Sequence, residues 1–479
     1  MCPLPMRLRC SLPLFVLLAL AAGTTTAAGT SDPFDTDLIT PPNPAFTSTS
    51  GVVDNPCKEH SAQTVYGVLE VVDLALCRNP ATREAWANAR AQAALVGVAR
   101  GASLPGLDAR VGTARNWQDG NSNTRQNSAT LTLSWLLYDF GARDADLENA
   151  RQLLSAASSS LEATVQNVFL AALQAYYNAQ AARAAVIAAL ESEKASRASL
   201  TAAEVRYRVG TGTPADRLQA QTALSQATLN RIQAQGALRT ALGTLAATMG
   251  LAANQPLRLA AIPETVPPPS FERDVDALID AAKENRPDLR AAEAQVLAAE
   301  ASVAATRAAG LPSLSLSAGP NWVNSGSGGG NFDGTSGTIG LTLSIPIFSG
   351  FDTTYRVRAA QARAEASGAQ RDSLQLQVAL DVWSNYQNLT TATQSIRTSV
   401  DLLASAEQSA RVALGRYKAG VGTILDVLNA QSALANARLQ GIQAQLDWNV
   451  ARAALARAVG ALDRRLLDPA TGVANTPTP

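Results

Sequence analysis

The feature that most constrains this chain is a segment that occurs twice. The sequence RYRVGTGTPADRLQAQ begins at Arg206, and the similar RYKAGVGTILDVLNAQ begins at Arg416, 210 residues further on. Aligned without a gap, residues 206–235 and 416–445 share 17 of 30 positions. Self-similarity at this level indicates an internal duplication. A chain of 479 residues can form two to four domains or one large body of two similar halves, and the duplication makes the second arrangement available.

Composition favours the body of two halves. Hydrophobic residues make up 47% of the chain and aromatic residues only 5%, so the apolar content is mostly Ala, Leu and Val. Such a composition suits long helices that pack closely. The formal net charge is zero, with 39 basic and 39 acidic residues, which argues against a nucleic-acid partner.

An enzyme is disfavoured. The single histidine, His60, lies in a polar stretch, and the sequence contains no glycine-rich phosphate loop after a strand, no ligand set with metal spacing and no triad. We therefore expect no catalytic residues, no cofactor and no metal.

The first 28 residues resemble a secretory signal. Arg7 and Arg9 precede the apolar stretch SLPLFVLLALAA, and small residues follow it. Elsewhere the chain has no apolar run long enough for a membrane helix. Cys2 and Cys10 would leave with the signal, so Cys57 and Cys77 remain, and an oxidising compartment would allow a disulfide between them.

The rest of the chain repeats one order of elements. We expect a polar leader at 29–63, a first repeat at 64–250, a proline-rich linker at 251–273, a second repeat at 274–462 and a disordered tail at 463–479. Each repeat reads as helix, helix, strand, strand, long helix, turn, helix, and each long helix would be about 100 Å in length. The expected strands are at about 104–114, 129–138, 312–320 and 338–348, with a flexible polar loop, GPNWVNSGSGGGNFDGTSG, between the last two.

The strands alternate apolar and polar residues and have aromatic residues near their ends. These aromatic residues are Trp117, Trp135, Tyr138, Trp322, Phe348 and Phe351. Alternation alone fits an ordinary hairpin packed on a helix equally well. The signal, the two equivalent hairpins and the long helices favour lipid-facing strands with an aromatic girdle. Four strands cannot close a barrel, and open edges are not tolerated in lipid. A homotrimer would supply twelve strands around a lumen, continued by a tunnel of α-helices.

The order of elements, the strands LPSLSLSAG and LTLSIPIFSG, and above all RYKAGVGTILDVLNAQ resemble the TolC family of trimeric outer-membrane channel-tunnels. The resemblance extends from about Tyr66 to Leu462, and the segment VLEVVDLALCRNPATREAWANARAQAA is similar to the branch that serves type I secretion. It implies a passive exit duct in the outer membrane, extending into the periplasm, that works with a periplasmic adaptor and an inner-membrane ABC transporter to export a protein cargo such as a toxin.

The resemblance also implies roles at the repeated turn, which in the family forms the periplasmic gate. Tyr417 matches a tyrosine that helps hold the gate shut, and Asp426 matches a carboxylate that rings its narrowest point. Two positions depart from the best-known member: Gly422 replaces an arginine, and Asn429 replaces a second aspartate. We expect weaker closure for this reason. The equivalent positions of the first repeat are Tyr207 and Asp216.

Helix capping explains the same residues without a gate. Gly210 and Gly420, followed by Gly212 and Gly422, stand where helices end, and Arg206, Arg208, Arg416 and Lys418 place cations in the last turns. Thr213 with Asp216, and Thr423 with Asp426, fit capping boxes that open the next helices. The two tyrosines fit packing residues equally well.

Two other functions remain open at this point. A periplasmic adaptor also contains long helices, but it is expected to have one helical hairpin between β-rich modules. A multidrug-efflux channel of the same family differs from a toxin-export channel only in its cargo and its inner-membrane partners, which the sequence does not identify.

Overall fold

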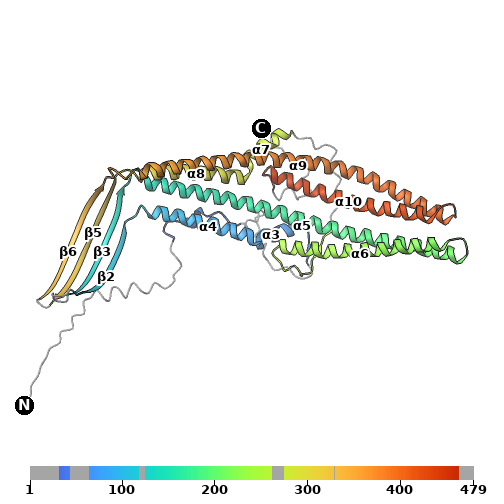
Figure 1. Cartoon of the computed structure of the whole chain (residues 1–479), viewed down its shortest axis with the longest axis horizontal. Coiled ribbons are helices and arrows are strands. Elements are labelled where there is room, and N and C mark those ends of the chain that lie inside the picture. Colours follow the sequence, from blue (N-terminus) through green and yellow to red (C-terminus); the bar gives the residue numbers. More distant parts are fainter. Residues whose placement is uncertain (1–31, 44–63, 118–123, 261–273, 328–329, 463–479) are drawn as a thin grey trace, which may run out of the picture.

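The computed structural model describes residues 32–43, 64–117, 124–260, 274–327 and 330–462. The molecule is elongated, with four long strands at one end and two tight helix turns at the other (Figure 1). The expected signal, most of the leader and the expected tail lie outside these residues. None of the helices in the described ranges has both the length and the apolar character needed to cross a membrane.

The predicted duplication is confirmed. The first half contains α3 (Val68–Arg78), α4 (Pro80–Gly101), β2 (Gly106–Asn116), β3 (Thr124–Tyr138), α5 (Ala142–Arg208) and α6 (Pro214–Thr248). The second half contains α7 (Val275–Asn285), α8 (Pro287–Ala308), β5 (Ser313–Ser327), β6 (Gly330–Ser344), α9 (Asp352–Lys418) and α10 (Ile424–Ala458). The long helices α5 and α9 have 67 residues each, which corresponds to about 100 Å.

Part of the expected leader is ordered. A short helix, α2 (Thr36–Ile39), packs beside α4, where the Trp86 indole donates a hydrogen bond to the Pro41 carbonyl at 3.2 Å. The Arg100 guanidinium donates to the Phe34 carbonyl at 2.8 Å. Residues 32–43 of the expected polar leader are therefore held against α4 by two of its long side chains.

The first part of the expected linker is also ordered. Strand β4 (Arg258–Leu259) pairs in parallel with β1 (Val65–Tyr66). This pairing returns the chain from α6 to the start of the first half. Tyr66 is buried there in an apolar cluster with Leu173, Tyr176 and Leu245. A second cluster, around Trp448, occupies the equivalent part of the second half.

The four long strands form one antiparallel sheet in the order β2, β3, β5, β6. The central pair, β3 and β5, joins the two halves, with Leu133 opposite Ala318. Within the described residues, β2 and β6 have a strand partner on one side only. One chain therefore provides a four-stranded sheet with two open edges.

The prediction of a flexible loop at 319–337 is wrong, because β5 and β6 extend through most of this segment and pair in continuous register. Glycine and serine have low strand propensity, which conceals a strand whose backbone is nevertheless fully paired. The expected strand at 338–348 ends at Ser344 instead, and Pro346, which has no N–H to donate, follows shortly after.

The β3–β5 ladder is interrupted opposite Pro320. The paired positions pass from Thr130–Asn321 directly to Leu133–Ala318. Pro320 has no N–H for the ladder, and the backbone of Gly319 lies so close to Leu131 that an added Cβ would stand 1.9 Å from its carbonyl oxygen. A glycine is required here by close approach of two backbones.

Candidate channel surfaces

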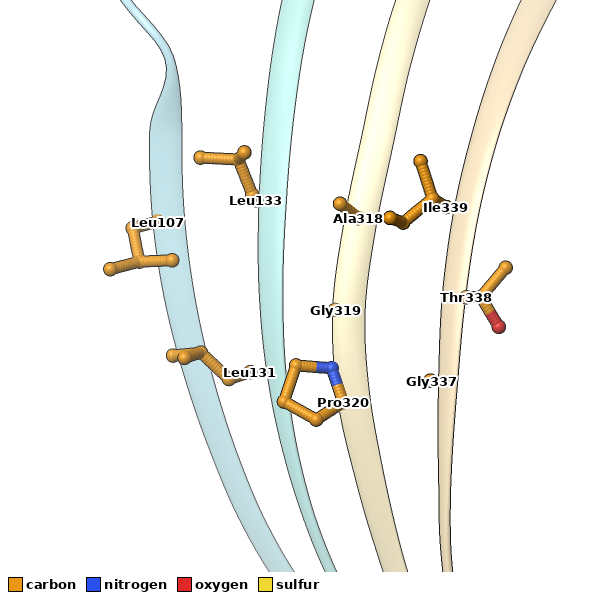
Figure 2. A pocket seen from close by; sticks show the side chains of 9 residues that line it. All are labelled: Leu107, Leu131, Leu133, Ala318, Gly319, Pro320, Gly337, Thr338 and Ile339. Carbon is orange, nitrogen blue, oxygen red and sulfur yellow. The ribbon is translucent and has the colours of Figure 1, made fainter.

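The strand register sorts the side chains of the sheet into two faces. One face carries five consecutive apolar rows. From the helix end outward, they consist of Tyr138, Leu314 and Leu343; Trp135, Leu316 and Leu341; Leu107, Leu133, Ala318 and Ile339; Ala109, Leu131, Pro320 and Gly337; and Val111, Ala129, Trp322 and Thr335. Figure 2 shows the middle of this face, where Leu133, Ala318 and Ile339 lie next to one another.

The height of these rows suits a membrane. Successive rows are two residues apart, or about 6.7 Å, so five rows span roughly 27 Å along the strands. With a strand tilt of about 40°, this corresponds to roughly 20 Å between row centres, close to the apolar band of about 25 Å in membrane barrels. Val111 and Ile339 are 83% and 84% exposed in the single chain. A continuous apolar face of this size requires a nonaqueous partner.

The opposite face is polar. It carries Asp108, Arg110, Ser128, Thr130, Thr132, Ser134, Ser315, Ser317, Asn321, Ser336, Thr338 and Thr342. Because strand side chains alternate strictly, closing the sheet with its apolar face outward directs all of these residues to the inside. The interior would then be lined by small hydrogen-bonding side chains.

Aromatic residues flank the apolar rows at the helix end. The Trp135 indole donates to the Ser103 carbonyl at 3.0 Å, and Tyr138 lies in the first row. Phe348 and Phe351 pack edge to face with ring centroids 5.5 Å apart. These residues occupy the place expected for an interfacial girdle.

The distal girdle has fewer rings. Trp322 lies in the outermost apolar row and donates from its indole to Asp333 at 2.8 Å. Trp117 directly follows β2 and is 77% exposed. The role of both sets of rings at membrane interfaces stays a prediction.

At the other end of the molecule, the two turns are built in the same way. Gly210 and Gly420 have φ of 78° and 82°, values that favour glycine. Each is followed by a capping box, in which Asp216 and Asp426 accept from the backbone N–H groups of their own capping threonines at 3.0 and 3.1 Å. The capping interpretation is therefore correct for both aspartates.

The second glycine of each turn permits close packing. An added Cβ at Gly212 or Gly422 would lie 3.1 Å from the Cβ of Arg206 or Arg416, respectively. An arginine at position 422, as in the best-known member of the family, would therefore need the end of α9 to shift.

The two turns contact each other through Arg206. Its guanidinium donates to the Tyr417 carbonyl at 2.9 Å and stacks 4.7 Å from the centroid of the Tyr417 ring. Tyr417 is 3% exposed and packs with Leu200, Ile424 and Val427. The sequence suggested only a dipole role for Arg206. The structure makes it a polar link between the two halves at their tips, beside the apolar packing of Tyr417 with Leu200.

The electrostatics of the tips follow from these contacts. Burial raises the pKa of the Tyr417 hydroxyl, and this effect outweighs the opposing influence of Arg206. The Thr423 backbone N–H, and next its hydroxyl, hold the pKa of Asp426 below its ordinary value, so this carboxylate is ionised at neutral pH.

The structure brings only some of the predicted gate residues together. Tyr207 is 39% exposed, with Arg217 stacked 5.2 Å from its ring centroid, so it differs from its buried counterpart. Asn429 is exposed on α10, and Asp426 is exposed at the start of the same helix. Tyr417 and Asp426 thus face different surroundings. Their roles in gating stay predictions.

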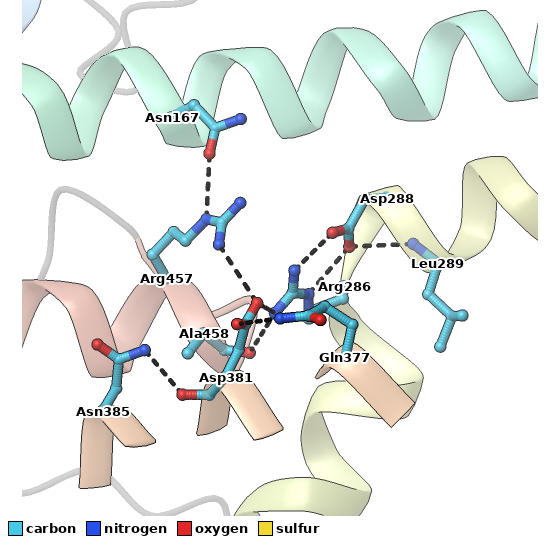
Figure 3. Close-up of polar contacts among 9 residues, drawn as sticks. All are labelled: Asn167, Arg286, Asp288, Leu289, Gln377, Asp381, Asn385, Arg457 and Ala458. Carbon is cyan, nitrogen blue, oxygen red and sulfur yellow. Dashed lines mark hydrogen bonds and ion pairs between the residues drawn. The ribbon is translucent and has the colours of Figure 1, made fainter. Parts of the chain in front are cut away.

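A charged cluster that the sequence did not reveal lies where α8, α9 and α10 meet (Figure 3). Arg286, 3% exposed at the start of α8, forms ion pairs with Asp288 at 2.5 Å and with Asp381 of α9 at 3.2 Å. Arg457 of α10 lies 4.0 Å from Asp381 and donates to Asn167 of α5 at 3.1 Å. Burial alone would raise the pKa of Asp288, but hydrogen bonding and charge from Arg286 more than offset it, and the net shift is downward.

One signal in the sequence could have exposed this cluster. The two halves have equivalent helix junctions, Asn79–Pro80 and Arg286–Pro287. Asn79 is an ordinary N-cap whose side chain accepts a hydrogen bond from the Ala81 N–H at 2.9 Å. Arginine cannot cap a helix in this way, so Arg286 in the equivalent position indicates a different structural role.

The predicted disulfide is tested in part. Cys77, buried on α3, is disulfide-bonded. Cys57 lies outside the described residues, so the pairing of Cys57 with Cys77 stays a prediction.

The fold therefore defines a protomer of an outer-membrane channel-tunnel: a short sheet with one apolar face, attached to two long helical hairpins. The family model described as "Outer membrane efflux protein" matches residues 71–251 and 278–461, one match in each half. The chain belongs to this family. It is an outer-membrane protein whose helices extend into the periplasm.

Curated relatives and solved structures agree with this membership. The chain is 33% identical to protein CyaE of Bordetella pertussis over 94% of this chain and 96% of that protein. It is 26% identical to the alkaline protease secretion protein AprF of Pseudomonas aeruginosa, over 84% and 86% of the two chains. The outer membrane channel CmeC of Campylobacter jejuni has the same fold, with a TM-score of 0.72 at 19% identity and coverage of 82% and 86%.

Proposed function

We propose that the protein is the outer-membrane exit duct of a type I protein secretion system. Three copies form a continuous channel through which a secreted protein passes, without chemistry performed by the duct itself. The similarity to an alkaline protease secretion protein, over most of both chains, supports a protein cargo over small molecules.

The open edges of the sheet are the main observation in support of a channel made of three copies. Strands β2 and β6 end the sheet of one chain, and the apolar face between them requires lipid. Unpaired strand edges are not tolerated in a membrane, so β6 of one chain pairs with β2 of the next. Both edge strands then run antiparallel, as their neighbours do, and three chains close a barrel of twelve strands.

The helix turns form the gate at the periplasmic end. Within one chain, the Arg206–Tyr417 contact holds the second turn against the first. Opening separates these tips, which breaks this contact. A periplasmic adaptor and an inner-membrane ABC transporter supply the binding energy for opening, since the duct contains no nucleotide-binding loop of its own.

Single-channel conductance in a planar bilayer tests this function. Purified wild-type protein should give small, largely closed, cation-selective currents. Tyr417→Phe and Asp426→Ala should give larger or less selective currents, because the first removes the buried hydroxyl beside Arg206 and the second removes an exposed carboxylate of the second turn. Asp216→Ala is a matched control for loss of a capping box, because its turn lacks a buried tyrosine.

The proposal fails if well-folded protein gives no currents and has the mass of a single chain in detergent. A drug-efflux duct of the same family would conduct in the same way. Secretion of a protein substrate by cells that contain the matching transporter distinguishes the two cargoes.

A further inference from the structure

The apolar face of the sheet continues, beyond its last row, into a polar and then a basic row. Thr113, Asn127, Asn324 and Asp333 form the first row past Val111. Arg115 and Arg125 stand directly opposite each other in the next row, and Gly326 and Asn331 complete it.

The two arginines face the same side as the lipid-facing residues. Arg115 is four residues beyond Val111 on β2, and Arg125 is four residues before Ala129 on β3, so both share the parity of the apolar rows. Their row lies about 13 Å further along the strands than the outermost apolar row, at the distance where head groups replace lipid chains.

Their pairing is unfavourable without an anion. Directly opposed like charges on neighbouring strands repel each other, and the Cβ atoms of such a pair are only about 5 Å apart. Both side chains are exposed, and in the described part of the chain neither guanidinium forms an ion pair. Among the described residues of this face, the nearest carboxylate is Asp333, which lies two strands from Arg125 and accepts from Trp322.

We propose that Arg115 and Arg125 bind the phosphate groups of membrane lipids in the leaflet that faces the cell exterior. A planar guanidinium recognises phosphate through two parallel hydrogen bonds, and two of them fit a lipid bearing more than one phosphate. The site is continuous with the apolar band, so the lipid chains lie against Val111 and Ala129 while the head group meets the arginines. In a trimer, three such sites anchor the duct at a fixed height.

The test uses the purified full chain in neutral detergent, titrated with bisphosphorylated lipid A, the same lipid without phosphates, or inorganic phosphate. Binding is read as a change in thermophoresis. We expect binding of the phosphorylated lipid only. Arg115→Ser with Arg125→Ser should weaken it roughly thirtyfold, at about tenfold per 1.4 kcal/mol and about 1 kcal/mol per basic residue near a lipid surface.

Two controls keep the result interpretable. Arg110→Ser removes an arginine from the inner face of the same strand and should leave lipid binding unchanged. Arg115→Lys with Arg125→Lys keeps both charges but loses the paired hydrogen bonds of the guanidinium groups, so it should bind more weakly than the wild type and more tightly than the double serine variant. Without lipid, Arg125→Ser should not lower the melting temperature, because it relieves repulsion.

The proposal is overturned if the double serine variant binds lipid A as the wild type does, or if Arg110→Ser weakens binding equally. It is also overturned if inorganic phosphate or the dephosphorylated lipid binds as tightly as lipid A, since the site would then not recognise a phosphorylated head group.

Discussion

Replacing Arg286 with methionine should loosen the junction at which α7 and α8 meet the hairpin of α9 and α10. The guanidinium is buried and pairs with two carboxylates whose side chains are 28% and 29% exposed. Removing one member of a buried ion pair costs about 3–5 kcal/mol. Because water still reaches both carboxylates, we expect a value near the lower end, about 3 kcal/mol.

Hydrogen exchange measured by mass spectrometry detects this change locally. Amides in the first turn of α8 and the last turn of α10 should exchange roughly a hundredfold faster in Arg286→Met, since each 1.4 kcal/mol is a factor of ten. The matched control is Arg290→Met, one turn further along α8. Its ion pair with Glu162 is about half exposed, and such surface pairs contribute at most about 1 kcal/mol.

The control should therefore change exchange by less than about fivefold. If Arg286→Met and Arg290→Met exchange alike in these turns, the buried cluster does not stabilise the junction, and the reasoning is refuted.

Three further predictions follow from the sheet, the turns and the buried cluster. Leu133→Arg, on the lipid-facing side, should cost about 2–4 kcal/mol and prevent membrane assembly, whereas Thr132→Arg, on the inner face, should assemble, as judged by heat-modifiable bands on gels. Arg206→Ala should raise the open fraction in bilayer recordings by at least about tenfold, because a hydrogen bond from a charged donor contributes about 1.5–3 kcal/mol, and Arg217→Ala should not. The stabilisation from Asp288, whose pKa is lowered, is present above the ordinary value of 3.8 and should be lost only as the pH falls through the lowered pKa, measured by exchange at the same junction.

Local sequence patterns predict much of the fold. The run between Gly141 and Val209 contains neither proline nor glycine, which predicts a helix of the length observed for α5. The threonine and aspartate pairs at the turns predict both capping boxes, because the motif needs only residues three apart.

The strand residues and contacts that the sequence did not predict depend on partners that are distant in the sequence. Strand β5 continues through Asn321 to Ser327 because β3 and β6 pair with it on both sides, and no local propensity reveals this. Arg206 and Tyr417 are 211 residues apart, so their contact depends on how the two halves pack. The same is true of Arg286 and Asp381, because the comparison of the two helix junctions marks Arg286 as unusual but does not identify its partner on α9.

The pairing of β2 with β6 between chains is tested most directly by disulfide cross-linking. A cysteine at Val111 is combined in turn with a cysteine at each outward-facing position of β6, in cells that insert the protein in the outer membrane. Opposed residues on antiparallel strands have Cβ atoms about 5 Å apart, which a disulfide can bridge with little movement. We expect one position and its neighbours to give bands of two and three linked chains, while inward-facing positions give none. Absence of linked chains at every position would contradict a barrel shared by three copies.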